Sequence, residues 1–167
     1  MPLPIIISRL SNFLFFIQKA DKKVLAELDL KIYFSGENLD LLFYGKNNNA
    51  VWKQIEKGIG QEKTKRFQKS IRPFQAAFHL HWRDEVRLLL SCKKYFQSNE
   101  PLLRRVITDI KRLTGTEHFT LAHVPMHLIS DFTHSDDTIH AWFSWTPKKS
   151  FLVVEIPPSF EPRDDLF

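Results

Sequence analysis

Residues 99–115 read NEPLLRRVITDIKRLTG and carry the clearest helix signal in the chain. Pro101 suits the first turn of a helix, and Gly115 is typical of the position just after its end. Between them runs an apolar stripe at helical spacing, made up of Leu102, Leu103, Val106, Ile107, Ile110 and Leu113. We therefore predict a helix over 101–113 that docks on a sheet through Val106, Ile107 and Ile110.

The pattern changes to strands after this helix. We predict strands over 118–124, 126–132, 138–146 and 151–156, with residues 147–150 as a hairpin turn. A run of strands that follows a helix-rich part favours an α+β fold. The expected architecture is a single domain over 1–156, with a mainly antiparallel sheet. It should contain three to five helices, concentrated in the N-terminal and middle parts.

The N-terminal half supplies most of the other predicted elements. An amphipathic helix is indicated by Ile6, Leu10, Phe13, Leu14 and Ile17. Further elements are a short helix over 22–28, a hairpin over 29–44 and a helix over 50–57. Residues 61–70 are polar and basic, and form either an exposed helix or a loop.

Residues 74–82 alternate strictly between apolar and polar side chains. Phe74, Ala76, Phe78, Leu80 and Trp82 would share one face of a strand. Residues 84–97 fit either a helix or a return strand, and we favour the helix.

Composition excludes several classes of protein. Of 167 residues, 43% are hydrophobic, which excludes a wholly disordered chain. The single cysteine, Cys92, excludes a disulfide framework within the chain and indicates a reducing, cytoplasmic location. The apolar run at 3–17 is too short to span a membrane. Its stripe, within 5–17, should pack on its own domain, with peripheral membrane contact or dimerisation as alternatives. Residues 157–167 form a proline-containing acidic tail that we expect to be flexible.

Positive charge is concentrated in two segments. The chain has a net charge of +5, and residues 53–72 alone carry a net +5. The candidate partner-binding residues in this segment are Lys53, Lys57, Lys63, Lys65, Arg66, Lys69 and Arg72. The second segment, 104–112, contributes Arg104, Arg105, Lys111 and Arg112. Such segments are either solvated helix faces or surfaces for an anionic partner.

Two of the seven histidines lie close together at His79 and His81. In a strand they would share one face and could bind a divalent metal. The pattern resembles the paired-histidine metal motif of single-strand nucleases and replication initiators, in which a helical tyrosine attacks the DNA phosphate. Tyr95 follows here, but Ser98 stands where that pattern has Lys. The other reading is two solvent-facing histidines.

The stretch 118–140 holds five more histidines, of which His118, His123 or His127 could supply a third ligand for a metal at His79 and His81. His118-Phe119-Thr120 resembles half of the paired signature of the two-histidine phosphoesterases, and the second half is missing. No phosphate loop, dinucleotide fingerprint or hydrolase nucleophile motif occurs in the sequence.

These observations favour a small, basic, intracellular and non-catalytic binding module. Its basic face, residues 53–72 with 104–112, would engage nucleic acid or an acidic protein without a cofactor. The alternative is a histidine-dependent metalloenzyme or phosphoesterase that uses His79 and His81, or the 118–140 histidines, with a divalent metal. The sequence does not decide whether the protein is an enzyme.

Overall fold

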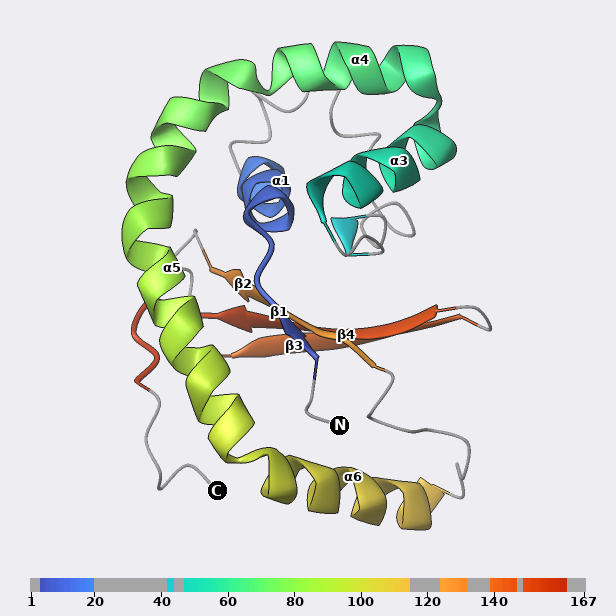
Figure 1. Ribbon diagram of the computed structural model, residues 1–167, viewed down its shortest axis with the longest axis vertical. Helices are drawn as coiled ribbons and strands as arrows, with labels where there is room; N and C mark the ends of the chain where they lie inside the picture. The colour runs from blue at the N-terminus through green and yellow to red at the C-terminus, as the bar shows by residue number, and fades with distance from the viewer. Residues whose placement is uncertain are drawn as a thin grey trace.

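The computed structural model describes residues 4–19, 42–43, 47–114, 124–131, 139–146 and 149–161. Within them, helices surround a four-stranded sheet, so the predicted α+β fold is confirmed (Figure 1). The predicted short helix over 22–28 and most of the predicted hairpin over 29–44 lie outside the described residues. So does the predicted strand over 118–124, apart from Val124.

The sheet has the strand order β1-β2-β4-β3. Its strands are β1 (Ile5–Ile6), β2 (Met126–Ser130), β3 (His140–Thr146) and β4 (Lys149–Ile156). β2 is parallel to both β1 and β4, whereas β3 and β4 form an antiparallel hairpin. The sheet is therefore mixed rather than mainly antiparallel. The long connection between β1 and β2 contains helices, and such crossovers return the chain in the same direction.

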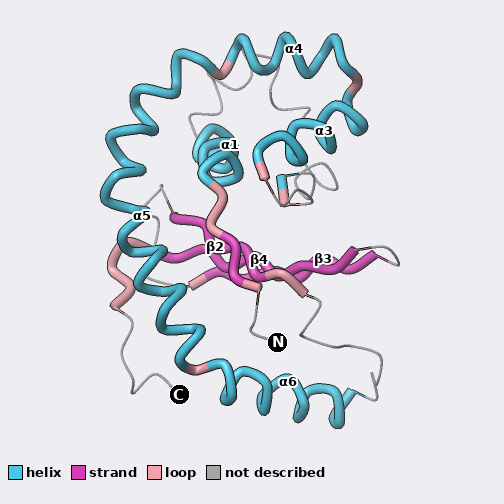
Figure 2. Tube along the Cα trace, in the orientation of Figure 1, coloured by secondary structure: helices cyan, strands magenta, loops and turns pink. Residues whose placement is uncertain are grey.

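The helices are α1 (Arg9–Lys19), α3 (Asn48–Ile59), α4 (Gln61–Ser70), α5 (Gln75–Ser98) and α6 (Glu100–Thr114). A short 3-10 helix, η3 (Arg72–Phe74), links α4 to α5. Together α4, η3 and α5 form a bent arc with α1 on its inner side (Figure 1). Figure 2 shows α6 at the opposite end of the molecule from α4. The helix predicted over 101–113 is thus confirmed as α6. The side chains of Val106, Ile107 and Ile110, through which it was expected to dock, are outside the described ones.

Side chains of β2 and β4 are buried on both faces of the sheet, whereas His140 and Ala141 at the start of β3 are exposed. Phe151 and Val153 of β4 belong to a first core cluster with residues of α1, α3 and α4. Val154 and Ile156 belong to a second cluster with residues of the C-terminal half of α5. Trp82 of α5 packs against both clusters. The centre of the sheet, at β2 and β4, is therefore covered on both faces.

The strand predicted over 74–82 is wrong, because these residues form η3 and the start of α5. Phe74, Phe78 and Trp82 recur every four residues, so one helix face can bury them as well as a strand face can. Ala76 and Leu80 are exposed instead, with 74% of Leu80 accessible to solvent. The helix favoured over 84–97 is confirmed as the continuation of α5.

The N-terminal amphipathic stripe is used within the domain. Phe13, Leu14 and Ile17 are buried in the first core cluster, while Ile6 lies in β1 rather than in the helix. No helix in the described parts of the chain is both long and apolar enough to cross a membrane. Of the predicted tail, Pro157 is buried and Phe160 packs against the second cluster.

Candidate functional site

All seven cations predicted in the segment 53–72 are exposed on the outer side of α3, α4 and η3. They are Lys53, Lys57, Lys63, Lys65, Arg66, Lys69 and Arg72. We call them the basic surface. The ion pairs found in the described parts of the chain join Arg83 to Asp84 and Arg104 to Glu100. None of the seven cations therefore forms an ion pair within the described residues, although Glu56 and Glu62 are exposed on the same helices.

Helix α4 holds the central part of this surface in place through its opposite face. Thr64 and Phe67 are buried, and the Phe67 ring meets the Trp52 ring edge-on at 5.9 Å between centroids. The Thr64 hydroxyl donates to the Gly60 carbonyl at 2.8 Å. At 100° per residue, Lys65 and Lys69 point away from this buried face. Local packing thus directs the cations into solvent.

Gly60 sets the angle between α3 and α4. Its φ of +88° and ψ of +157° lie in a region that is almost confined to glycine. At the other end of α3, Asn47 caps the helix, since its Oδ1 accepts from the Ala50 N–H at 3.0 Å. The Asn47 cap and the Gly60 conformation fix where α3 begins and where α4 leaves it. They therefore position the cations of both helices.

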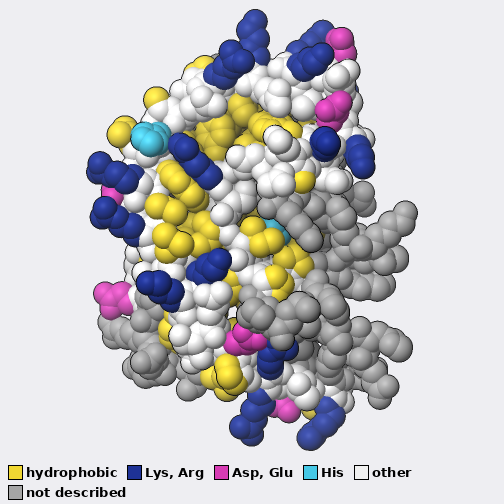
Figure 3. All heavy atoms as spheres, in the orientation of Figure 1, with side chains coloured by type: hydrophobic (Ala, Val, Ile, Leu, Met, Phe, Trp, Pro, Cys, Tyr) yellow, Lys and Arg dark blue, Asp and Glu magenta, His cyan; other side chains and the backbone are white. Residues whose placement is uncertain are grey.

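The second predicted basic segment does not join this surface. Helix α6 lies at the far end of the molecule from α4, and Figure 3 shows Lys and Arg side chains gathered over each of these helices. Arg104 is already paired, because its Nε donates to Glu100 Oε1 at 2.7 Å. Arg105 and Arg112 are exposed. The prediction that residues 53–72 and 104–112 form one face is wrong. The long helix α5 separates α4 from α6, so the two basic segments lie at opposite ends of the molecule.

The predicted metal pair does not form. His79 and His81 are both exposed on α5, where residues two apart point about 200° away from each other. His79 Nδ1 lies 3.2 Å from the Arg9 guanidinium, and the His81 ring packs near Phe16. The predicted metal site is wrong because it required residues 79–81 to form a strand, whereas they belong to helix α5. His118 and His123 lie outside the described residues. Within the described ones, no three His, Cys, Asp or Glu side chains are grouped to hold a metal.

Two further residues of the 118–140 stretch occupy different environments. His127 of β2 is only 2% exposed and lies against the rings of Phe43 and Phe151, at 5.3 and 5.9 Å between centroids. Neither of its ring nitrogens has a hydrogen-bond partner among the described residues, and burial lowers its pKa to about 4. His140 is exposed at the start of β3, opposite Glu155. No alternation of apolar and polar residues singled out His127, because all five residues of β2 are buried.

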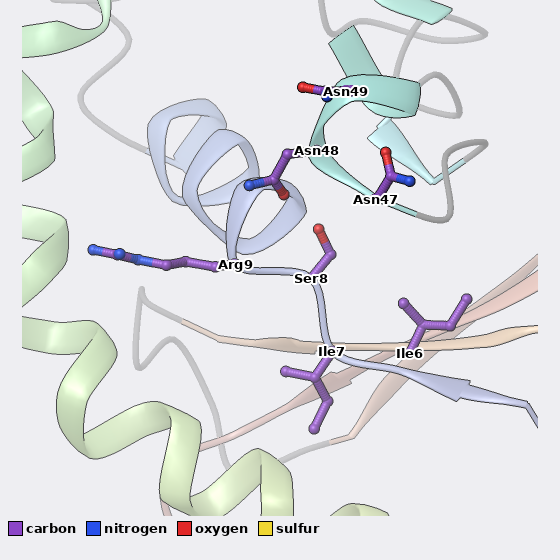
Figure 4. A pocket seen from close by; sticks show the side chains of 7 residues that line it. All are labelled: Ile6, Ile7, Ser8, Arg9, Asn47, Asn48 and Asn49. Atoms are coloured by element: carbon purple, nitrogen blue, oxygen red, sulfur yellow. The ribbon is translucent and has the colours of Figure 1, made fainter.

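A hollow of about 420 Å³ lies between the N-terminal ends of α1 and α3 (Figure 4). Ser8 and the three asparagines 47–49 supply its polar lining, and the Arg9 side chain extends away from them toward α5. None of the described residues that line it is a carboxylate, His or Cys. It therefore offers hydrogen bonds but no acid–base pair.

Cys92, the single cysteine, is buried in the second core cluster as expected, and burial raises its pKa to about 12. It is thus a small core residue rather than a nucleophile.

Comparison of the chain with protein-family models, curated proteins and solved structures gave no match.

Proposed function

We propose that this protein is a non-catalytic module that binds nucleic acid through the basic surface of α3, α4 and η3. The observation that carries the proposal is the set of seven exposed cations that form no ion pair within the described residues. Cations that are not held in such ion pairs are available to replace the counterions of an external polyanion. Release of those counterions supplies most of the free energy of non-specific nucleic-acid binding.

The composition of the surface favours nucleic acid over an acidic protein. Five of the seven cations are lysines, and lysine is depleted at protein–protein interfaces relative to the rest of the surface. Such interfaces also use aromatic anchors. The two aromatic side chains next to the cations, Trp52 and Phe74, are half-buried and packed against the first core cluster. Phosphates, by contrast, need only positive charge and hydrogen-bond donors.

The single cysteine suits a reducing compartment, so we propose a cytoplasmic location.

A pair of matched variants tests the proposal. Arg66→Gln with Arg72→Gln removes two charges from the basic surface. The control, Arg105→Gln with Arg112→Gln, removes two equally exposed charges from α6. Affinity for a labelled 20-base-pair DNA is measured by fluorescence anisotropy at about 50 mM salt. We expect the first variant to bind at least fivefold more weakly and the control to bind like the wild type.

Equal affinities of the two variants would contradict the proposal, as would the absence of binding by the wild type. Polyglutamate of similar total charge serves as the competitor. If polyglutamate displaces the DNA at an equal or lower charge concentration, the partner is an acidic protein instead.

A further inference from the structure

We infer that the nucleic acid is a duplex, and that the outer side of α5 extends the contact beyond the basic surface. This inference rests on the proposed function and names its partner more closely. It starts from three cations that the predicted basic segments did not include: Arg83, Arg87 and Lys94. All three are exposed on α5, which follows α4 and η3 along the same arc (Figure 1).

These three cations lie on one ridge of the helix. Spacings of four and seven residues bring side chains to the same face, about 6 and 10.5 Å apart along the axis. The opposite face holds Leu89 and Cys92, which are buried in the second core cluster. Arg83 is partly neutralised by Asp84, 3.6 Å away. Arg87 and Lys94 have no such partner among the described residues. The outer side of α5 therefore adds at least these two unpaired charges to those of the basic surface.

A row of charges on a rigid helix favours a partner with a high and regular charge density. A duplex carries one negative charge per about 1.7 Å of its axis, and binding releases more counterions per contact than with a single strand. The cations of α4 and α5 are held by helices that are anchored in the core, so their spacing is preorganised for a partner whose phosphates are also regularly spaced. The ridge of α5 therefore matches the duplex better.

No large aromatic side chain of the described residues is fully exposed, and Trp52 and Phe74 beside the basic surface are half-buried. Proteins that bind single strands stack bases on exposed aromatic side chains. The large hydrophobic side chains exposed on the described residues are Leu80, Leu90, Leu113 and Ile139, none of which is aromatic. Single-stranded RNA is often read on an open sheet face. Here residues from both sheet faces are buried in the two core clusters.

Three labelled DNA and RNA probes of equal length test the inference by anisotropy with the full chain. They are a 20-base-pair DNA duplex, the same RNA duplex and a 20-nucleotide single-stranded DNA of mixed sequence. We expect the DNA duplex to bind at least tenfold more tightly than the single strand, and the RNA duplex shows whether the contact distinguishes the two kinds of duplex. We also expect Arg87→Gln with Lys94→Gln to raise the duplex Kd at least threefold and to reduce the salt slope by about 2.

The Arg105→Gln, Arg112→Gln variant is again the control for loss of two exposed charges. Circular dichroism confirms that each variant keeps its helices. Single-strand binding as tight as duplex binding would overturn the inference, and so would an Arg87→Gln, Lys94→Gln variant that binds like this control. In either case an effect of Arg66→Gln with Arg72→Gln would leave the proposed function standing, whereas the loss of that effect would remove the function itself.

Discussion

The side chain of Asn12 continues the sheet where β1 ends. Its Oδ1 accepts from the backbone N–H of Ser130 at 3.0 Å, and its Nδ2 donates to the Leu128 carbonyl at 3.2 Å. β1 pairs only with Met126 and His127 before the chain turns into α1. The fully buried carboxamide of Asn12 thus serves the next two backbone groups of β2 as a strand would.

Replacement of Asn12 by Ala should destabilise the fold strongly. It leaves the Ser130 N–H and the Leu128 carbonyl buried without partners, at about 1–3 kcal/mol for each group. We expect chemical denaturation to show a loss of roughly 2–6 kcal/mol in the free energy of unfolding. Asn99→Ala is the control, because half-buried Asn99 donates one bond to the Tyr95 carbonyl. Equal losses in the two variants would show that Asn12 does not complete the sheet.

The helical assignment of residues 75–82 gives a second prediction, because two apolar side chains have opposite environments. Phe78 is 2% exposed and packs its ring 5.0 Å from that of Phe13, whereas Leu80 is 74% exposed. Phe78→Ala should cost roughly 3–5 kcal/mol of unfolding free energy, and Leu80→Ala less than about 0.5 kcal/mol. Thermal and urea denaturation measure both. A strand with both side chains on its buried face would instead make both substitutions costly.

Gly60 should resist substitution for conformational reasons alone. A Cβ at this position would meet no atom within 4 Å, so a steric clash does not contribute. The positive φ nevertheless disfavours any other residue, and Gly60→Ala should cost roughly 1–3 kcal/mol. The control is Gly58→Ala inside α3, which should be neutral or stabilising, since alanine is the better helix former. Equal stabilities of the two variants would contradict this account of the α3–α4 junction.

His127 should make stability depend on pH. Its pKa is lowered to about 4 in the folded protein, against an ordinary value near 6.5. Between these values the unfolded chain binds the proton and the folded chain does not, so stability falls as the pH falls. The loss should begin near pH 6.5, reach roughly 3 kcal/mol and level off near pH 4. Urea denaturation at several pH values measures it.

The variant His127→Leu should flatten this pH profile, because it removes the titrating group while retaining a side chain that packs against Phe43 and Phe151. Measurements between pH 7 and 8.5 provide the baseline for both proteins. A profile with the same slope in the variant would assign the acid sensitivity to other groups.

The sequence predicted individual helices and strands more reliably than their arrangement in the fold. The α6 prediction succeeded because its capping residues and apolar stripe agree. The strand over 74–82 failed because Phe74, Phe78 and Trp82 satisfy both periods, and local alternation does not show which of them the core buries. The mixed sheet also escaped prediction. Whether two strands run parallel is decided by the path of the chain between them, which leaves no mark within either strand.

For the candidate site as well, the exposure of single residues could be predicted, but the distances between segments could not. Exposure of the cations from Lys53 to Arg72 followed from their position on polar helix faces. Their separation from Arg104 and Arg105 followed only from the arrangement of α5 and α6. The buried state of His127 could not be foreseen either, because its partners Phe43 and Phe151 come from distant parts of the chain.

The salt dependence of binding tests the central claim most directly. The variant replaces Lys63, Lys65, Arg66 and Lys69 of α4 by Gln, and Kd for a DNA duplex is measured from about 50 to 200 mM salt. If all four cations contact phosphates, the slope of log Kd against log salt should fall by about 3.6 relative to the wild type, at about 0.9 for each contact. Parallel lines for the two proteins would contradict the assignment of the basic surface as the nucleic-acid interface.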